Sequence, residues 1–467
     1  MQRSRLASLL VFAGVLLVLA SMGLLSSVLD DWEQANGSFR LNKLTVNIDR
    51  SVASAADAGL SLRDAGQLVK AWSPLPVAYS AKAQTRAAAG AASAVADVFG
   101  VNGHYRDFAE VRLKAGTSIA PASVDEHSRV AVIGSRLADR LFRSGQVVGK
   151  PIELFGAAFT IIGVYDSEGS LLRQMTDDGI PDVLIPVTAM FDVHASARID
   201  TLQLAARPDA SVDSEGEAAQ RVLEAIGQPP TQFRVANGVL AFTRIAQLRA
   251  LLLFGCGAIA IVMLAQLTYR LLGRAYGLLR GRLLTDDWSD ALLSEKRRLL
   301  TSVLAMAGMA ACIAGLWELI RFRLYIPPEW VPEQVIDLSF YMDKLRSLWQ
   351  QQAADGGYVP SSPERLADAA GRLAGRLFAA GALLGVPVFL LGIRLWAMVR
   401  VPLYLQLQQL FFCIPAAALA AFAAARWAGL YYRIEPLEYA VAGALFTVSI
   451  FYFTSTKGVT LSHEKNS

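Results

Sequence analysis

RVAVIGSRLADRLFRSGQVVGKPIELFGAAFTIIGVY, residues 129–165, is the stretch that decides the fold of the polar part of this protein. It opens with a short apolar run, Val130–Ile133, which is typical of a buried strand. Ser135 then stands where it can cap a helix, and Gly145 stands where it can end one. The apolar face expected for that helix consists of Leu137, Ala138, Leu141 and Phe142.

The second half of the stretch predicts a β-hairpin. Ile152–Leu154 and Phe159–Val164 are rich in strand-forming residues, and Gly156 separates them. The order is therefore strand, helix, hairpin, and no catalytic residue type stands at its centre. From the pattern alone we expect a small α/β subdomain.

The residues themselves resemble the periplasmic core domain of the MacB-like ABC transporter permeases. That family shows an apolar strand, then S-x-x-L-A-x-x-L-F, V-G-K-x-I-x-L and F-T-I-I-G-V. The matching pieces here, in the same order, are Val130–Ile133, Ser135–Phe142, Val148–Leu154 and Phe159–Val164.

The resemblance extends on both sides, over roughly residues 30 to 250. Upstream, Val98–Val101 and Leu113–Gly116 resemble the family's y-F-x-V and L-x-x-G-R pieces, although Thr117 stands where the family has arginine. Downstream, Asp182–Pro186 resembles the family's strand that ends in proline.

Composition indicates a membrane protein with a large polar part. The 467 residues are 54% hydrophobic and only 18% charged, whereas soluble domains carry about 25% charged residues. The formal net charge of +4 is small for this length. A nucleic-acid-binding role would need a concentrated basic face, so we expect no nucleic acid among the partners.

Cysteine and histidine usage predicts neither disulfides nor a metal site. Cys256, Cys312 and Cys413 all fall in apolar segments, and the four histidines are scattered singly. A metal site needs clustered ligands, so we expect no metal and no bound cofactor.

Apolar runs predict about six membrane spans. We interpret the first as an uncleaved span because it exceeds the apolar region of a signal peptide, which is about 7 to 15 residues long. Pro387 is expected to kink the fourth span. The expected spans are Leu6–Leu29, Leu251–Leu272, Leu299–Ile320, Leu377–Trp396, Leu410–Ala425 and Ala440–Phe453.

The fold class expected is therefore α+β: a transmembrane α-helical bundle with a large extracytoplasmic mixed α/β domain between the first two spans. The resembled family usually has four spans, so the last two are additions or a rearranged end. The boundaries expected are 1–29 (first span), 30–245 (periplasmic core domain), 246–272 (stalk and second span), 273–298 (cytoplasmic loop), 299–320 (third span), 321–372 (second periplasmic loop), 373–456 (three further spans) and 457–467 (cytoplasmic tail).

Within the polar domain, the alanine-rich segments 52–72 and 81–98 are expected to be helices. Thr201–Ala205 alternates like a strand and precedes a helix. The face of that helix contains Ala218, Val222, Leu223 and Ile226.

Residues 239–253 predict an amphipathic helix that runs directly into the second span. Phe242, Ile245, Leu248 and Leu252 recur at helical spacing. In the resembled family such a stalk carries motion between the membrane and the outer domain. The plainer interpretation is a long helix with one end in water.

Arg274–Arg298 is expected to be a polar cytoplasmic loop because its basic residues outnumber its acidic ones. In the resembled family a short helix in this place docks onto the ATPase. The resemblance implies a docking site here, and any solvated loop helix would have a similar pattern. Its candidate residues are Arg274, Gly277, Trp288, Leu292 and Leu293.

The second outer loop, 321–372, is longer than the family's short link, and we expect it either to cover the mouth of the bundle or to touch the main outer domain. Glu318 is expected to be interfacial. Trp427, Tyr431 and Tyr432 predict an interfacial aromatic cluster.

The catalytic motifs sought are missing from the sequence. Gly145–Pro151 has the wrong spacing for a G-x-x-x-x-G-K-[ST] phosphate loop and lacks its hydroxyl residue. We found no G-x-S-x-G elbow, no zinc-protease motif and no paired intramembrane carboxylates. We therefore expect no catalytic residues, and ATP would be bound by a partner subunit.

The resemblance implies a permease subunit of an ABC transport or efflux system in a bacterial inner membrane. The implied partners are a cytoplasmic ABC ATPase, a second permease copy or a sister permease, a periplasmic adaptor and the lipid bilayer. The alternatives are a non-transporting FtsX-like scaffold or regulator, or the non-coupling half of a heterodimeric permease. An outer-domain enzyme anchored by helices is the third hypothesis, and no site in the sequence favours it.

Overall fold

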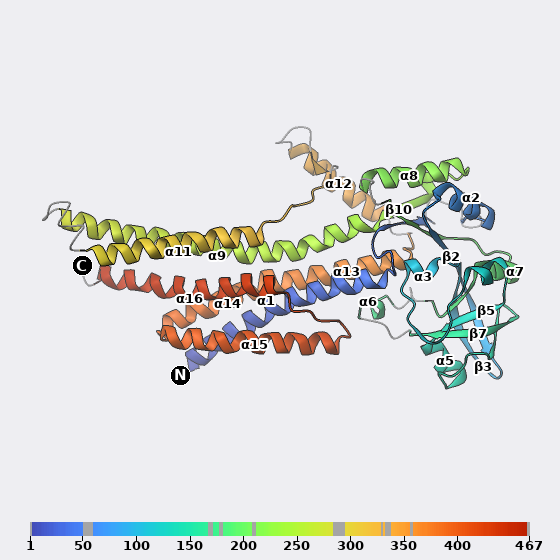
Figure 1. Cartoon of the computed structure of the whole chain (residues 1–467), viewed down its shortest axis with the longest axis horizontal. Helices are drawn as coiled ribbons and strands as arrows, with labels where there is room; N and C mark the ends of the chain where they lie inside the picture. The colour runs from blue at the N-terminus through green and yellow to red at the C-terminus, as the bar shows by residue number, and fades with distance from the viewer. Residues whose placement is uncertain are drawn as a thin grey trace. The chain divides into compact units, whose positions relative to one another are not determined.

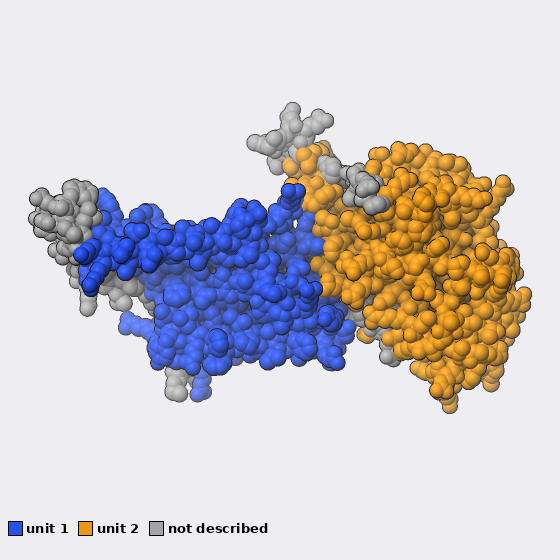
Figure 2. All heavy atoms as spheres, viewed as in Figure 1, with its two compact units in different colours: residues 1–27, 246–324, 373–467 blue, residues 28–245, 325–372 orange. Residues whose placement is uncertain are grey.

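The structure is a computed structural model that describes residues 2–49, 59–166, 171–176, 181–207, 212–283, 295–327, 330–331, 338–354 and 358–464. The chain divides into two compact units (Figure 2). The helical unit comprises residues 1–27, 246–324 and 373–467, and the sheet unit comprises residues 28–245 and 325–372.

Six helices of the described chain are long and apolar enough to cross a membrane, as predicted. They are labelled in Figure 1. Each helix is longer than the apolar run that predicted it, because polar residues at the ends of the run belong to the same helix. Their bounds are α1 (Gln2–Ala35), α9 (Gly238–Leu283), α11 (Lys296–Ile320), α13 with α14 (Ser362–Ala379 and Val386–Val399), α15 (Leu403–Trp427) and α16 (Pro436–Glu464).

Helices α13 and α14 are joined by a π-helical turn, Ala380–Gly385. Pro387 lies in the first turn of α14, directly after the π turn, and has no N–H to bond to a carbonyl of that turn. The predicted fourth span therefore corresponds to a longer helix with a π turn just before the proline.

Small residues let α1 and α14 approach closely within the helical unit. A Cβ atom added to Gly14 would lie 2.5 Å from Phe389 atoms, and one added to Gly392 would lie 2.8 Å from Val11. Glycine at such positions lets helix backbones pack against each other in a membrane, where van der Waals contact replaces the hydrophobic drive.

A buried ion pair joins three helices of the same unit. The Glu438 carboxylate on α16 is 1% exposed; it accepts from Arg249 Nε on α9 at 2.7 Å and from Ser26 Oγ on α1 at 2.8 Å. The last helix, α16, is thereby tied to α1 and α9.

The sheet unit is built on a mixed ten-stranded sheet. The strand order is β10-β1-β9-β2-β3-β8-β5-β7-β4, and β6 pairs with β2 and β7. The β3–β8 and β5–β7 pairs are parallel and the other pairs antiparallel. The strands are β1 (Lys43–Ile48), β2 (Val77–Ala89), β3 (Ala92–Val101), β4 (Leu113–Gly116), β5 (Val130–Gly134), β6 (Pro151–Leu154), β7 (Ala157–Tyr165), β8 (Val183–Pro186), β9 (Thr201–Ala205) and β10 (Phe233–Asn237).

Short helices pack against this sheet and share its apolar core, which includes the fully buried Trp72, Phe159 and Leu202. The described helices of the unit are α2 (Leu62–Trp72), α3 (Tyr105–Phe108), α4 (Pro121–Asp125), α5 (Ser135–Phe142), α6 (Leu171–Gln174), α7 (Val187–Val193), α8 (Val212–Ala225) and α12 (Leu338–Ala354), with a 3-10 turn at Pro230–Gln232.

The opening stretch folds as strand, helix and hairpin, as predicted, with two local corrections. Gly134 and not Ser135 is the N-cap of α5, and no side chain caps that helix. The helix ends at Phe142 because Arg143 takes a left-handed conformation with φ +51°, so Gly145 does not end it. The hairpin turn is built by Phe155 and Gly156, both with positive φ.

The prediction of helix for 81–98 is wrong. These residues belong to β2 and β3, which pair from Ser80–Val101 to Ala89–Ala92 and turn at Gly90. Alanine favours helix, but the segment alternates small and polar residues with a period of two, and pairing within the sheet outweighs the local preference. The exposed face of β2 carries Lys82, Gln84 and Arg86.

Of the segment 52–72, which is also expected to be helical, residues 62–72 are helical, and 52–58 lie outside the described residues.

Two further expectations are corrected in the helical unit. Residues 274–283 continue α9 and residues 296–298 open α11, so the predicted polar loop is largely helical where the structure describes it. Tyr432 is buried against the position of Gly23, whereas Trp427 is 93% exposed, so the three aromatic residues do not form one interfacial cluster.

Candidate functional site

Three helices of the described chain continue from the sheet unit into the helical unit, and within the sheet unit their ends contact β1 or its neighbours. Residues 28–35 of α1, 238–245 of α9 and 362–372 of α13 all belong to the sheet unit. Each of these helices is attached to β1 or to a strand paired with it, by contacts described in turn below. The candidate site is therefore the junction of these three helix ends with the sheet.

Helix α9 starts without any linker. Strand β10 ends at Asn237, and α9 begins at Gly238. The Asn237 side chain accepts hydrogen bonds from the backbone N–H of Val239 at 2.9 Å and of Leu240 at 3.2 Å, as an N-cap residue does. A Cβ atom on Gly238 would lie 2.5 Å from the Leu41 carbonyl oxygen. Glycine therefore lets the helix start directly against the chain that leads into β1.

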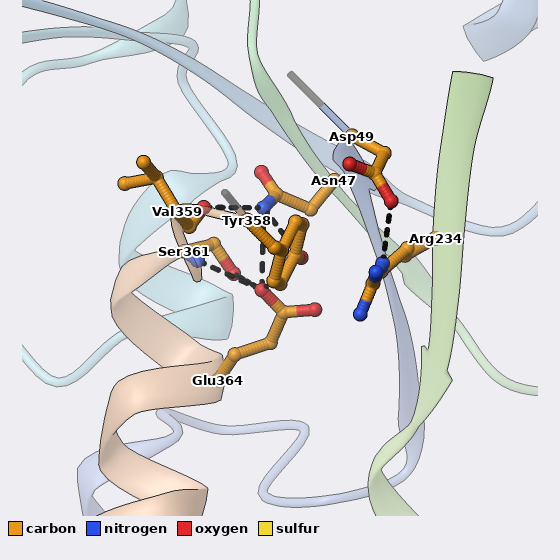
Figure 3. A network of polar contacts seen from close by, with 7 residues as sticks. All are labelled: Asn47, Asp49, Arg234, Tyr358, Val359, Ser361 and Glu364. Atoms are coloured by element: carbon orange, nitrogen blue, oxygen red, sulfur yellow. Dashed lines mark hydrogen bonds and ion pairs between the residues drawn. The ribbon is translucent and has the colours of Figure 1, made fainter. Parts of the chain in front are cut away.

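Helix α13 is attached through a cluster of polar residues that we call the polar clamp: Asn47, Arg234, Tyr358, Ser361 and Glu364 (Figure 3). Glu364 Oε2 accepts from the Ser361 backbone N–H at 2.7 Å and from the Ser361 hydroxyl at 2.9 Å. This is the acidic half of a capping box, in which a glutamate in the first helical turn bonds back to the cap residue.

The same carboxylate oxygen reaches the sheet. It accepts from the Tyr358 hydroxyl at 2.6 Å and from Asn47 Nδ2 at 3.2 Å. Asn47 Nδ2 also donates to the Tyr358 hydroxyl at 2.8 Å, and the other end of its amide, Oδ1, accepts from Thr201 on β9 at 3.2 Å. Strands β1 and β9 are thus linked to the cap of α13.

Arg234 on β10 closes the clamp from the other side. Its guanidinium carbon lies 3.9 Å from the centre of the Tyr358 ring, a cation–π geometry, and its Nε lies 2.7 Å from Asp49 Oδ2. Burial raises the pKa of Tyr358, and the neighbouring Glu364 carboxylate raises it further. The hydroxyl therefore stays protonated and continues to donate at physiological pH.

Lys43, the first residue of β1, connects the end of α1 to the sheet. Its side chain is buried, and Nζ donates to the Gln203 side chain on β9 at 2.7 Å, to the Asn36 carbonyl at 3.4 Å and to the Phe108 carbonyl. Because all three acceptors are neutral oxygens, they only partly offset burial, which lowers the pKa of Lys43 to about 7. A cavity of about 90 Å³ lies beside it, lined also by Ser80 and Tyr105.

The three helix ends also touch one another inside the sheet unit. The rings of Trp32 on α1 and Phe242 on α9 lie 5.9 Å apart, and a Cβ atom on Gly371 of α13 would lie 3.4 Å from Ile245 on α9. The predicted continuity of residues 239–253 with the second span is confirmed, since α9 is one helix of 46 residues.

The structure describes two of the five predicted docking residues, so the docking site stays a prediction. Arg274 and Gly277 lie on the last turns of α9; Arg274 is exposed, and a Cβ on Gly277 would meet nothing within 4 Å. Trp288, Leu292 and Leu293 lie outside the described residues. Glu318 is exposed and lies 2.8 Å from Arg321. No group of three or more histidine, cysteine or acidic residues able to hold a metal occurs in the described part of the chain.

Reasoning from the sequence missed the polar clamp, although one signal for it was present. Ser361 followed three residues later by Glu364 is the spacing of a capping box and marks the start of a helix inside the second outer loop. No local sequence motif predicts the role of Asn47, because an asparagine in a strand can form many different hydrogen bonds. Two roles are expected for the loop 321–372. The one observed within the sheet unit is contact with the main polar domain, through the bonds of Asn47 to Tyr358 and Glu364.

Residues 6–222 match the MacB-like periplasmic core domain. The chain carries a MacB-like periplasmic core domain. It is 30% identical over 112 residues to the macrolide export ATP-binding/permease protein MacB of Syntrophobacter fumaroxidans, and 28% identical over 153 residues to that of Bdellovibrio bacteriovorus. The first match covers 24% of this chain and 15% of the relative; the second covers 30% and 23%. The chain thus spans less than a quarter of either relative.

Two solved structures are similar to the MacB-like domain. The periplasmic region of MacB from Actinobacillus actinomycetemcomitans has 18% identity and a TM-score of 0.37, covering 44% of this chain and 92% of that one. The extracellular domain of the transporter YknZ from Gram-positive bacteria has 17% identity and a TM-score of 0.35, covering 42% and 100%. With this domain between its first two membrane-length helices, the chain has the features of a multi-pass membrane protein with a MacB-like periplasmic core domain.

Proposed function

We propose that this chain is a permease subunit that couples ATP hydrolysis by a separate ABC ATPase to motion of its MacB-like domain. In this proposal the chain lies in a bacterial inner membrane with the sheet unit on the periplasmic side. It works with a second permease copy or a sister permease. The chain itself supplies a mechanical relay and binds no nucleotide.

The observation that carries the proposal is the junction of β10 with α9. A strand that passes into a 46-residue helix with no linker cannot absorb rotation or translation in a flexible loop. The Asn237 cap and the close contact of Gly238 with Leu41 hold the first turn in place. Displacement of α9 in the membrane would therefore be transmitted to β10 and to its partner β1.

The polar clamp adds a second connection on the same strand. Strand β1 is hydrogen-bonded to β10, which continues into α9, and it is linked to α13 through Asn47. A shift of α9 relative to α13 would therefore exert force on β1 through both connections. ATP binding by the partner must favour one arrangement of these helices over another to drive such a shift.

Charge distribution along the helices supports the proposed orientation. Basic residues gather at the end of α9 opposite to its junction with β10 and at the start of α11. Positive charge marks the cytoplasmic side of short membrane loops. These residues are Arg274, Arg280, Lys296, Arg297 and Arg298.

The decisive experiment is to purify the full chain from its host, identify the proteins that come with it, and insert Gly-Gly between Asn237 and Gly238. We expect an ABC ATPase to be retained by both forms. Nucleotide-dependent changes in protease protection of the sheet unit should occur only in the uninterrupted chain. Equal nucleotide-dependent changes in both forms would exclude α9 as the route of coupling.

The docking residues are tested in the same purification. Charge substitutions at Trp288 and Leu292 should release the ATPase while the permease remains folded, and unchanged co-purification would remove Trp288, Leu292, Leu293, Arg274 and Gly277 as a docking site. If no ATPase is found and an outer enzyme or a sister permease is retained, the chain is instead a scaffold of the FtsX-like kind or a non-coupling half.

A further inference from the structure

The helical unit contains a cavity that has no role in the proposed relay, although Arg274, which lines it, is also a candidate docking residue. It has a volume of about 300 Å³ and lies among α9, α11 and α16. Its wall is mainly apolar, and Ser455 is the small polar residue on it. The apolar lining consists of Leu264, Leu267, Leu271, Met309, Val448 and Phe451.

Two arginines lie on the same cavity, one helical turn apart on α9. Arg270 is partly exposed; it donates to the Tyr452 hydroxyl at 3.2 Å, and its guanidinium carbon lies 4.6 Å from the centre of the Tyr452 ring. Arg274 is exposed. Among the described residues that line the cavity none is acidic, so the charge presented there is positive.

The depth of the two arginines fits the headgroup layer of the far leaflet. Helix α9 enters the helical unit at Ala246. At a rise of about 1.5 Å per residue, Arg270 and Arg274 lie roughly 36 and 42 Å further along the helix. The hydrocarbon core of a bilayer is about 30 Å thick. Long arginine side chains reach from such positions to the headgroups.

We propose that this cavity is a binding site for one anionic phospholipid of the leaflet that faces away from the MacB-like domain. An acyl chain would lie against the apolar wall, and the phosphate and the additional headgroup charge would meet Arg270 and Arg274. Basic pockets between membrane helices suit anionic headgroups, whereas a zwitterionic lipid offers the same chains with no net charge. The charge complementarity selects this occupant over a neutral lipid.

The test uses the full chain, purified in mild detergent from membranes and incubated with equal amounts of phosphatidylglycerol and phosphatidylethanolamine. Retained lipid is counted by native mass spectrometry. Wild-type protein should retain phosphatidylglycerol in preference. In the R270Q/R274Q variant the ratio of retained phosphatidylglycerol to phosphatidylethanolamine should fall by about fivefold for each arginine removed. This is the contribution of one basic residue near an anionic membrane surface to binding.

Two matched variants separate headgroup recognition from the cavity itself. Arg280 is an exposed arginine on the same helix that does not line the cavity, so R280Q should retain phosphatidylglycerol like wild type. L267W fills the cavity and should lower retention of both lipids without changing their ratio. Gel filtration and heat unfolding confirm that each variant is folded.

The proposal is overturned if wild type retains both lipids equally or if R270Q/R274Q matches wild type. It is also overturned if R280Q loses as much lipid as the double variant, because any surface charge would then suffice. A dimer that carries no lipid would show that a second copy covers the cavity, and this too rejects the proposal. Since the readout needs no ATPase, failure here leaves the proposed relay standing.

Discussion

Asn47 and Tyr358 lie 311 positions apart in the chain, yet the Asn47 side-chain amide donates a 2.8 Å hydrogen bond to the Tyr358 hydroxyl. This contact places the segment 325–372 on β1, the strand that also contacts the start of α9 and the end of α1. The sheet unit is therefore closed on itself by residues from both of its segments, 28–245 and 325–372.

Tyr358→Phe should loosen the polar clamp while keeping the ring beneath Arg234. The substitution removes the donor to Glu364 and the acceptor for Asn47, which is expected to cost about 1–3 kcal/mol because the groups left behind are partly buried. We expect faster proteolysis within residues 325–372 and a lower unfolding temperature of the full chain. Tyr341→Phe, on the exposed side of α12, is the control. Equal effects of the two changes would contradict the role assigned to the clamp.

Two glycines of α9 should respond in opposite directions to alanine. Gly238→Ala places a Cβ 2.5 Å from the Leu41 carbonyl oxygen and must displace the chain leading into β1. Gly255→Ala meets nothing within 4 Å and should stabilise the helix by about 1 kcal/mol. Heat unfolding of the full chain in detergent measures both. A harmless Gly238→Ala would show that the strand–helix junction tolerates movement.

The Arg249–Glu438 pair should behave as a coupled unit. Replacing Glu438 by Gln removes the charge that Arg249 faces. Because Arg249 is 35% exposed and can be hydrated, we expect a cost of about 1–3 kcal/mol, less than for a fully buried pair, and a smaller cost when both residues are replaced. A double-mutant cycle on unfolding in detergent measures the coupling. The control pair is Arg433 and Glu435, 3.4 Å apart with Arg433 68% exposed, where coupling should stay below about 1 kcal/mol. Similar coupling in both cycles would argue against a structural role for Glu438.

Lys43 should make the stability of the sheet unit depend on pH. Its pKa falls from 10.5 to about 7 in the folded chain, so between these values the unfolded state binds more protons. The unfolding free energy should therefore rise with pH above about 7, with a slope of up to about 1.4 kcal/mol per pH unit, and level off below it. Hydrogen exchange of β1 and β9 in the full chain, corrected for intrinsic rates, follows this slope.

Lys43→Met is expected to abolish the slope, since it removes the titrating group. Lys150→Met, at an exposed position, should leave the slope intact. A slope that persists without Lys43 would assign the pH dependence to another group.

The parts of the fold that followed from the sequence are those governed by near neighbours. The six apolar helices, the hairpin around Gly156 and the continuity of 239–253 with the second span each depend on residues within one or two dozen positions. The helix predicted for 81–98 failed because alanine's local preference gave way to pairing of β2 with β3 and β6 and of β3 with β8. The β6 and β8 partners, Glu153 of Ala88 and Val183 of Val98, are distant in the sequence.

The candidate site shows the same division. The Ser361–Glu364 spacing marks the start of a helix, but it does not say what else the carboxylate binds. Lys43, Arg234 and Asn47 are ordinary polar residues until the sheet order β10-β1-β9 brings them beside α1, α9 and α13.

From the order of its residues alone, this protein is a multi-span membrane chain with a MacB-like domain, since membrane insertion, turn chemistry and the family motifs are all read over short distances. Only the tertiary structure decided which strand carries the three helix attachments, which acid is buried among the helices and where arginines meet an apolar cavity. These depend on contacts between distant segments, whose free energy is set by burial and by satisfied hydrogen bonds that no local pattern encodes.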